Sequence, residues 1–437
     1  MQRSLPFSLG FLLLATGAAA QEAPVVLEFS FSNPGARAMG LGGAFTALAD
    51  DATAAFANPA GLVQLTRPEV SIEGRIWSYS TPFTLGGRFD GSEPTGILLD
   101  NTNGLRTARS SQDLAGLSFL SFVYPKENWS LAFYRHQSAN FEFRSETQGL
   151  FARASPPFEE RREIDIRSFF DLELVNYGIS AAYRLSEGFS FGLGISYMVG
   201  NFMSQADLFF PTNESLPEGF LGPNSYEPET RLATNLLVVD DSDWTFNLGA
   251  LWHISRQWSV GGFFRQGPKF PLEARALSGP FLQDLSVGTV LGTAQSPIGF
   301  PDVFGLGVAF KSKNEALTVV AEWDRVQYST ILDSLDPNNF DAEGSALDDG
   351  DELRAGLEYV FLDWSPLVAI RIGTWLDPDH RLRDLDDPLG QALFRGGDDQ
   401  LHFTAGFGIA FRRLQIDLGF DLSDVLKTAS VSTVFSF

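Results

Sequence analysis

Residues 189–200 read Phe-Ser-Phe-Gly-Leu-Gly-Ile-Ser-Tyr-Met-Val-Gly. Apolar side chains occupy every odd position of this stretch, and mostly small residues occupy the even ones. Because successive side chains of a β-strand point to opposite faces, the alternation predicts a strand with one apolar face and one small or polar face. A strand of this kind fits the wall of a transmembrane β-barrel, which has lipid on one side and a lumen on the other.

The same alternation returns in residues 401–412 and 414–423. One such segment could belong to a soluble sandwich, but a series along the whole chain is harder to explain in that way. The last residues, 429–437, predict a final strand with Val431, Phe435 and Phe437 facing outward. A terminal aromatic residue resembles the signal that the barrel-assembly machinery recognises, so we expect that machinery as a partner during biogenesis.

The predicted connections alternate between short and long, as they do in outer-membrane barrels. Counting strands outward from the short turns predicts an antiparallel up-and-down barrel of fourteen strands over residues 67–437, with both termini in the periplasm. Aromatic residues that include Tyr124, Trp129, Trp252 and Trp258 lie beside the short turns, where the lower interfacial girdle is expected. The short turns are expected at 125–128, 186–188, 255–257, 312–315, 362–366 and 412–413, and the long loops near 82–112, 144–163, 205–243, 277–299, 332–350 and 378–399.

The first twenty residues predict export. Arg3 gives a positive start, residues 7–15 an apolar core, and residues 18–20 (Ala-Ala-Ala) a small-residue cleavage site. The alternative, an N-terminal membrane anchor, is disfavoured because the apolar run is shorter than the roughly 20 residues that a membrane helix needs. We therefore expect a signal peptide over residues 1–20 and a mature protein in the cell outer membrane.

The formal net charge of −23 argues against a nucleic-acid partner, whose phosphates would be repelled. Much of the acid lies in residues 336–352 and 377–387, where solvated loops are the plain interpretation and weak binding of divalent cations is the alternative. No segment has the ligand spacing of a calcium loop, so we name no metal site and expect no cofactor. The absence of Cys suits a barrel closed by backbone hydrogen bonds.

Residues 21–66 differ in character from the strands that follow. They are rich in Gly and Ala, they suggest short helical turns over residues 44–57, and a turn signal follows at Asn58-Pro59. A small-residue segment of this kind cannot build a core of its own, so we expect it to pack inside the barrel as a hatch. The residues expected to form the hatch are Gly40, Gly42, Gly43, Phe45, Asp50, Asp51, Asn58, Pro59 and Ala60.

Three short motifs in this segment resemble the N-terminal hatch of the FadL-type family, the outer-membrane transporters of long-chain fatty acids and aromatic hydrocarbons. They are the glycine run of residues 40–43, Ala-Asp-Asp at 49–51 and Asn-Pro-Ala at 58–60. Residues 175–197 resemble barrel strands of the same family. The resemblance implies uptake of long-chain fatty acids or other hydrophobic compounds: capture among the outer loops, an interior pocket gated by the hatch, and lateral exit at a kinked third strand.

The third strand is expected over residues 129–143, and its alternation falters in a polar patch. The resemblance implies a lateral gate here, formed by Gln137, Ser138, Ala139 and Asn140, although Ser138 stands where family members often carry Gly. The alternative is that the strand has passed the membrane boundary and is solvated there.

Two further sets of side chains are candidates for function. Phe209, Phe210, Phe220 and Leu221 are apolar residues in a polar loop, and they either form a capture groove or the loop's own small core. Charged residues are expected to face the lumen, because charges facing lipid would cost about 2–4 kcal/mol each. We expect them to hold the hatch to the wall; the alternative is that one of the arginines binds a fatty carboxylate. These charged residues include Arg184, Arg265, Arg371 and Asp417.

The sequence gives less support to other functions. The chain has only four His, and none has an evident orienting partner for catalysis, so we do not expect an enzyme. A secretion-accessory or structural barrel, which would bind a protein partner, is the main alternative, and a general porin is disfavoured by the hatch. The expected partners are a hydrophobic small molecule, outer-membrane lipids and lipopolysaccharide, and we expect a monomer.

Overall fold

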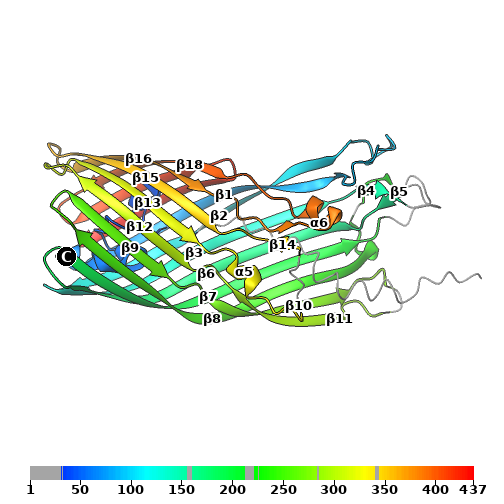
Figure 1. Cartoon of the computed structure of the whole chain (residues 1–437), viewed down its shortest axis with the longest axis horizontal. Coiled ribbons are helices and arrows are strands. Elements are labelled where there is room, and N and C mark those ends of the chain that lie inside the picture. Colours follow the sequence, from blue (N-terminus) through cyan, green and yellow to red (C-terminus); the bar gives the residue numbers. More distant parts are fainter. Residues whose placement is uncertain are drawn as a thin grey trace, which may run out of the picture.

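The computed structural model describes residues 31, 33–154, 160–211, 221–224, 226–282, 285–339 and 344–437. The expected signal peptide (1–20), residues 21–30 of the expected hatch, and Phe220 lie outside the described residues. Figure 1 shows an elongated barrel with the C-terminus and the short connections at one end and the long connections at the other.

The chain forms a closed antiparallel barrel of fourteen strands, which confirms the predicted fold class and strand number. The barrel closes where the first strand pairs with the last, from Glu69↔Ser436 to Tyr79↔Leu426. The wall segments are β1 (Glu69–Arg88), β2 (Leu105–Pro125), β3 (Trp129–Thr147), β6 (Asp165–Arg184), β7 (Phe189–Phe209), β8 (Arg231–His253), β9 (Trp258–Arg265), β10 (Lys269–Ser278), β11 (Val290–Gly299), β12 (Val303–Lys311), β13 (Leu317–Val326), β15 (Gly350–Phe361), β16 (Leu367–Asp377), β18 (Gln400–Ala410), β19 (Leu414–Leu422) and β20 (Leu426–Ser436).

Two wall strands are each interrupted once. β9 and β10 are the two halves of one strand, and β11 and β12 are the halves of the next, because β9 pairs with β12 and β10 pairs with β11. Pro268 and Pro301 stand at the two interruptions. Proline has no backbone N–H to donate to a ladder, so a break in the strand is expected at each.

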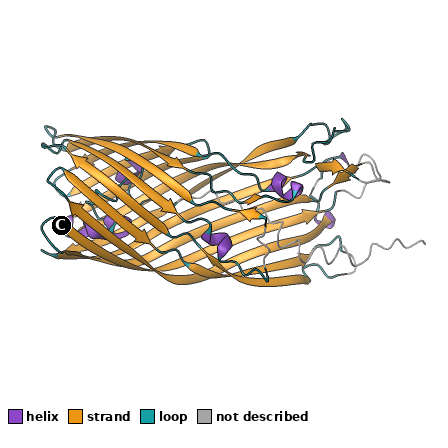
Figure 2. Cartoon of the chain, in the orientation of Figure 1, coloured by secondary structure: helices purple, strands orange, loops and turns teal. Residues whose placement is uncertain are grey.

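The remaining elements are short, and Figure 2 shows several of the helices inside the barrel. No helix among the described residues is long and apolar enough to cross a membrane. The short strands are β4 (Leu150–Arg153), β5 (Glu160–Arg162), β14 (Ser345–Ala346) and β17 (Arg383–Asp384), and the helices are α2 (Ala36–Gly40), α3 (Ala54–Ala57), η1 (Pro59–Gln64), η2 (Pro228–Thr230), α5 (Thr330–Asp333) and α6 (Pro388–Leu393).

All six predicted short turns lie between the expected strands. Several of the predicted long loops, however, are longer in the prediction than in the structure, because strands extend into them. β1 continues to Arg88 and β2 starts at Leu105, inside the expected loop 82–112. Likewise, β3 runs to Thr147, β7 to Phe209 and β8 starts at Arg231, so the long loops are shorter than the sequence suggested.

The extra strand length lies beyond the membrane band, and its polarity is reversed. Near the short turns, Phe191, Leu193 and Ile195 of β7 face outward and are exposed, as lipid contact requires. Nearer the long loops the inward side chains are apolar and buried, among them Phe141 on β3 and Leu272 on β10. Many of the outward residues there are polar or charged, such as Glu142 and Arg144 on β3, and these segments therefore resemble loops in the sequence.

The change from an apolar to a polar outer face along the strands allows a direct test of where the membrane-facing band of the barrel ends. Leu193→Arg, in the lipid-facing band, should lower the free energy of unfolding by about 2–4 kcal/mol. Ser111→Arg, on an exposed outer position of β2 nearer the long loops, should change it by less than about 0.5 kcal/mol. Denaturant titration of the protein folded into lipid vesicles measures both, and equal losses would contradict the assignment of the band.

Candidate functional site: the hatch segment and the chamber above it

Residues 33–65, called the hatch segment from here on, fill the lumen at the short-turn end of the barrel. Nearly all of them are buried, and their helices α2, α3 and η1 pack against strands from both sides of the wall. α2 contacts β16, β18, β19 and β20, whereas η1 contacts β3, β6, β7 and β8. The segment therefore crosses the lumen rather than lying along one strand.

Wall serines satisfy the backbone of the hatch segment. A backbone carbonyl buried without a partner costs free energy, and most hatch carbonyls are not used in regular helices. Inward-facing serine hydroxyls on five strands donate to them. The hydrogen bonds are Ser121 to Ala52 (3.3 Å), Ser130 to Leu62 (2.8 Å), Ser180 to Ala55 (2.6 Å), Ser190 to Ala60 (2.8 Å) and Ser259 to Ala47 (2.7 Å).

Wall glycines let the hatch backbone approach the strands closely. A Cβ on Gly192 would lie 2.3 Å from the nitrogen of Ala60, and one on Gly356 would lie 2.4 Å from the carbonyl oxygen of Leu41. Both distances are too short for any side chain, so the contact requires glycine. The same holds at further wall positions, namely Gly249, Gly261, Gly373 and Gly419.

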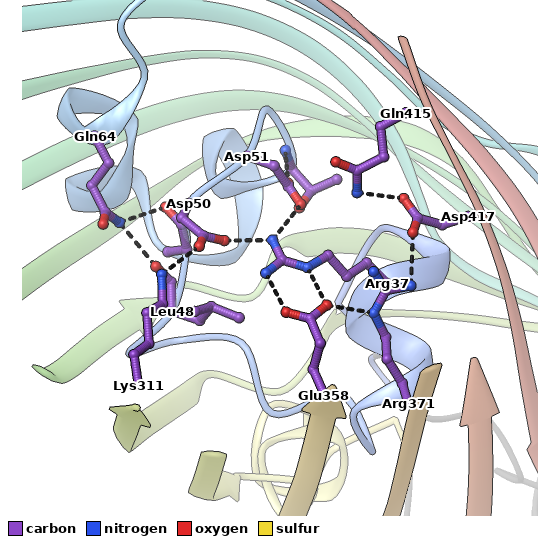
Figure 3. Close-up of polar contacts among 12 residues, drawn as sticks. Arg37, Leu48, Asp50, Asp51, Gln64, Lys311, Glu358, Arg371, Gln415 and Asp417 are labelled. Atoms are coloured by element: carbon purple, nitrogen blue, oxygen red, sulfur yellow. Dashed lines mark hydrogen bonds and ion pairs between the residues drawn. The ribbon is translucent and has the colours of Figure 1, made fainter. Parts of the chain in front are cut away.

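An ion-pair network joins the hatch segment to the wall (Figure 3). Arg37 lies between two carboxylates, 2.6 Å from Asp50 and 2.9 Å from Glu358. Arg371 extends the network, with 2.6 Å to Glu358 and 2.7 Å to Asp417. The network thus links α2 to β15, β16 and β19, and the structure brings together two of the lumen charges named from the sequence.

Asp50 is the hub on the hatch side. Lys311, at the end of β12, lies 2.8 Å from its second carboxylate oxygen. Burial alone would raise the pKa of Asp50, but the charges of Arg37 and Lys311 outweigh burial and hold the pKa of this carboxyl well below its ordinary value. Asp50 is therefore charged at neutral pH, and its negative charge is matched by two cations from different elements.

A second set of polar contacts holds the other turns of the hatch segment. Glu322 of β13 accepts hydrogen bonds from the backbone nitrogens of Phe45 (2.8 Å) and Thr46 (2.7 Å). The Asn58 amide donates to the carbonyls of Thr46 (2.8 Å) and Ala250 (3.1 Å). Asn58 therefore ties two hatch turns to β8.

The remaining residues that were predicted to form the hatch also lie in the contact between the hatch segment and the wall. Gly42 and Gly43 have φ of +71° and +79°, and Gly40 packs against Gly406 of β18. Asp51 accepts a hydrogen bond from the backbone of Thr53 at 2.9 Å. Pro59 and Ala60 press on Gly192, and Phe45 is fully buried.

The two remaining lumen charges have different surroundings. Arg184, at the short-turn end of β6, donates to the carbonyl oxygen of Val63 in the hatch segment. Arg265, on β9, places its guanidinium 3.9 Å from the ring centroid of Phe56, which also belongs to the hatch segment. Each of them therefore contacts the hatch, although neither forms one of the ion pairs described above.

Above the hatch segment lies an apolar interior, called the chamber from here on. It is largely filled by buried inward side chains of the upper strands, which pack as one cluster. These include Trp77, Tyr79, Ala139, Phe141, Phe170, Leu172, Phe202, Leu237, Phe263, Phe270 and Leu272. A small cavity of about 100 Å³ remains near its outer end, lined by apolar residues such as Phe83, Phe143 and Leu393, together with Arg381 and Arg395.

The backbone pairing of the wall is interrupted between β2 and β3. These strands pair only near the short turn, from Pro125↔Ser130 to Phe119↔His136. β3 stays paired with β6 along its whole length, with a register shift between Gln137 and Ala139. The interval where β2 and β3 are unpaired, beyond Phe119 and His136, is called the β2–β3 gap.

The bulge at Ser138 changes which residues of β3 face inward. Before it, even-numbered residues such as Tyr134 and His136 are buried, and after it odd-numbered residues such as Phe141 are. The outer half of β3 then contacts the inner side of β1, where the Tyr79 hydroxyl donates to the carbonyl of Asn140 at 2.9 Å.

The four residues named for a lateral gate are all at this bend. Gln137 donates to Glu173 at 2.6 Å, and Ser138 accepts from Asn176 at 3.1 Å. Ala139 packs in the chamber cluster, and Asn140 contacts β1 through Tyr79.

The residues named for capture are divided between a buried and an exposed environment. Phe209 is buried against the ring of Tyr226, with centroids 5.1 Å apart, and Leu221 is buried as well. Phe210 is 44% exposed and stacks on Phe281 with centroids 4.8 Å apart. Of the described residues in this set, only Phe210 offers a surface to an incoming solute.

Sequence reasoning missed the wall serines, the wall glycines and Glu73, whose carboxylate accepts from the backbone nitrogen of Gly35 at 2.9 Å. In the sequence, the wall serines and glycines are visible only as the small residues at alternate positions of each strand. The alternation does not indicate which of these small residues contact the hatch segment.

Comparison with known proteins agrees with this architecture. Residues 12–351 match the model of the family described as outer membrane protein transport protein (OMPP1/FadL/TodX). No curated protein matches the chain.

Several solved structures share the fold. A FadL homologue from Pseudomonas aeruginosa is 13% identical, with a TM-score of 0.61 over 95% of this chain and 100% of its own. The monoaromatic hydrocarbon channel CymD is 16% identical, with a TM-score of 0.54 over 94% of this chain and 99% of its own. The P. putida toluene transporter TodX is 14% identical, with a TM-score of 0.54 over 93% of this chain and 99% of its own. The chain is therefore a member of the FadL/TodX family of outer-membrane transport proteins for hydrophobic compounds.

Proposed function

We propose that this protein takes up long-chain fatty acids or similar apolar compounds by a lateral route. The solute is captured at the outer loops, enters the chamber, and leaves sideways through the β2–β3 gap while the hatch segment stays in place. The observation that carries the proposal is the position of the gap. The unpaired interval lies beside the apolar cluster of the chamber, immediately above a lumen filled by the hatch segment.

The fastening of the hatch segment favours a sideways exit. A path straight through the lumen would require breaking the Arg37 ion pairs, the serine hydrogen bonds and the Glu322 contacts together. Each net hydrogen bond contributes about 0.5–1.5 kcal/mol, and breaking a buried ion pair costs more. An apolar solute would also lose about 0.8 kcal/mol per CH₂ in a wet periplasmic path.

The outer surface beside the gap suits an apolar solute. A groove on the lipid-facing side of β2, β3 and β6 is lined by Leu120, Phe122, Phe133 and Ile179, with Arg135 at one side. A solute that leaves through the gap meets this apolar groove before it meets water. Lateral exit can thus deliver it to the membrane without a polar intermediate step.

The composition of the chamber supports an apolar solute. An interior lined by Phe, Leu and Trp side chains favours an apolar chain or ring, which fits fatty acids and aromatic compounds alike. It also favours uptake over the alternative of a secretion-accessory barrel, whose partner would be a protein. Capture by Phe210, a monomeric state, and partnership with lipopolysaccharide and the barrel-assembly machinery stay predictions, as does the absence of catalysis.

Deleting Ser138 tests the exit. Loss of the bulge residue should return β3 to a regular register and extend its pairing with β2 across the gap. Uptake of radiolabelled myristate by cells that lack their own transporter should then fall at least tenfold. Ser138→Ala keeps the residue count and should leave uptake near the level of the unmodified protein. Full uptake by the deletion variant, once its folded barrel is confirmed, would exclude exit at this bend.

Arg37→Leu tests the role of the hatch segment as a seal. The change leaves Asp50 and Glu358 without their shared cation and should weaken the hatch–wall contact by on the order of 3 kcal/mol. In planar bilayers we expect ion conductance to rise several-fold. Arg161→Leu removes an exposed cation from a surface ion pair and should leave conductance unchanged. Deletion of residues 35–65 should give the largest leak, together with loss of selective uptake; unchanged uptake in that deletion would contradict gating by the hatch.

A further inference from the structure

β1 loses its strand partner on one edge before the strand ends. On the edge that faces β20, the pairing stops at Tyr79↔Leu426, and the next strand on that edge is β4, which pairs with β1 only from Gly87. Within the described structure, residues 81–84 therefore have no strand beside them on this edge, although β2 pairs with them on the other. Pro82 lies in this interval and has no backbone N–H to donate.

The connection between β16 and β18, residues 378–399, takes the place of the missing strand. The Thr84 hydroxyl donates to the carbonyl oxygen of Ala392 in α6 at 2.5 Å, and α6 contacts β1. The wall is thus closed here by a loop helix of six residues instead of a ladder of backbone hydrogen bonds. Segments held by a few side-chain contacts open at lower free energy than paired strands do.

The cavity of about 100 Å³ at the outer end of the chamber adjoins this closure. Leu393 of α6 and Phe83 of β1 both line the cavity, and both pack against the chamber cluster. Phe143 lines it as well and belongs to that cluster. The cavity therefore connects the inner side of α6 with the apolar interior of the barrel.

A larger hollow, called the rim groove from here on, lies on the outer surface of the same part of the barrel. It has a volume of about 630 Å³, and Leu401, Phe403 and Leu422 line one side of it. These three side chains face outward and are 52%, 61% and 50% exposed. They end the apolar outer rows of β18 and β19, because the polar residues Gln400 and Ser423 come next. The rim groove therefore lies at the upper border of the lipid-facing band.

The rim groove and the cavity share part of their lining. Pro82, Arg381 and Gly396 border both hollows, so these residues separate the outer surface from the interior. The Arg381 side chain packs closely on Gly397, where a Cβ would lie 2.9 Å from its Nε and Cζ. The remaining side of the rim groove carries charges of both signs, which include Arg109.

We propose that the rim groove and the cavity form an entrance to the chamber from the outer leaflet of the membrane. An apolar compound dissolved in that leaflet docks against Leu401 and Phe403, and any polar group it carries lies towards the charged side of the groove. α6 then moves away from β1, and the solute passes Arg381 into the cavity. The inference rests on the proposed function and adds the side of the barrel from which the solute enters.

An entrance at this place separates arrival from departure. The β1–β2 hairpin stands between the entrance, on the outer edge of β1, and the β2–β3 gap, on the far edge of β2. A solute therefore enters and leaves on opposite sides of one hairpin, with the chamber between the two openings.

The entrance also selects solutes before they meet the chamber. Compounds with large apolar surface concentrate in a bilayer, because removing that surface from water is favourable. Such compounds reach the rim groove by diffusion within the leaflet. A polar solute does not enter the leaflet and has no access to the groove from that side.

A reversible cross-link between α6 and β1 tests the entrance. The chain has no Cys, so Thr84→Cys with Ala392→Cys introduces one unique pair, which a short bis-thiosulfonate reagent can join. Mass spectrometry confirms the cross-link in the folded barrel. Uptake of radiolabelled myristate by cells that lack their own transporter should fall at least tenfold when the pair is joined and should return when a reducing agent cleaves the link.

A cross-link that closes nothing is the matched control. Arg275→Cys with Thr293→Cys joins two exposed outer residues that already face each other on β10 and β11. Joining this pair should change uptake by less than twofold. Unchanged uptake after α6 is joined to β1 would overturn the entrance. Absence of uptake by the unmodified protein would instead contradict the proposed function.

Photolabelling follows the path in the unmodified protein. With a diazirine analogue of myristate in lipid vesicles, Leu401 and Phe403 should be labelled at least fivefold more than Leu193, which faces lipid away from the groove. Label should also appear at Leu393 in the cavity. Joining α6 to β1 should remove the label at Leu393 and leave the label in the rim groove. Labelling of Leu401 and Phe403 no stronger than that of Leu193, or cavity labelling that survives the cross-link, would overturn the inference.

Discussion

The fold depends on satisfying a backbone that makes little regular structure of its own. The hatch segment places about thirty residues inside a lumen, where water cannot reach most of their carbonyl and amide groups. Its three short helices satisfy only part of them. The wall must supply the rest, and it does so with small residues: Ser180 and Ser190 donate to hatch carbonyls, while Gly192 and Gly356 allow the approach. Larger side chains on the inner face of the wall would exclude the hatch segment. Glycine alone has no side-chain donor and would leave the carbonyls of the hatch segment unpaired.

This constraint divides the barrel into two sections with opposite interiors. Near the short turns, the interior is small and polar because it holds a backbone, and the exterior is apolar because it meets lipid. Nearer the long loops, the interior is apolar and the exterior is charged. On β3 the transition needs one extra residue, Ser138, which shifts the inward face from Tyr134 and His136 to Ala139 and Phe141. The pairing with β2 ends next to the same bulge, so the change of interior and the loss of β2–β3 pairing occur at one place on β3.

The sequence was informative where one face meets lipid and less so elsewhere. The six short turns, the strand number and the start of β1 at Glu69 followed from alternation and turn residues. The sequence predicts loop at the upper ends of β7 and β8, because outward residues such as Asp207 and Asp240 are acidic. The pattern there is still alternating, but with the faces exchanged. Within the site, Gly40, Gly42 and Asn58 stood out as a motif, whereas Ser180 did not, because its partner depends on the path of the hatch segment across the lumen. Burial of Phe209 and Leu221 likewise depends on loop packing that no local pattern encodes.

The contacts that hold the hatch segment differ between the two sides of the lumen. Arg37, Arg371 and Glu358 are concentrated where the hatch segment meets β15 and β16, on strands distant from the β2–β3 gap. On the strands beside the gap, the hatch segment is instead held by single hydrogen bonds from Ser121, Ser130 and Ser180, each of which is weaker than a buried ion pair. The hatch segment is thus restrained by ion pairs on one side of the lumen and by single hydrogen bonds on the other. Under the proposed lateral route, local movement around Phe56 can proceed while the ion pairs hold the remainder of the hatch segment, so passage of an apolar compound does not require an open aqueous pore.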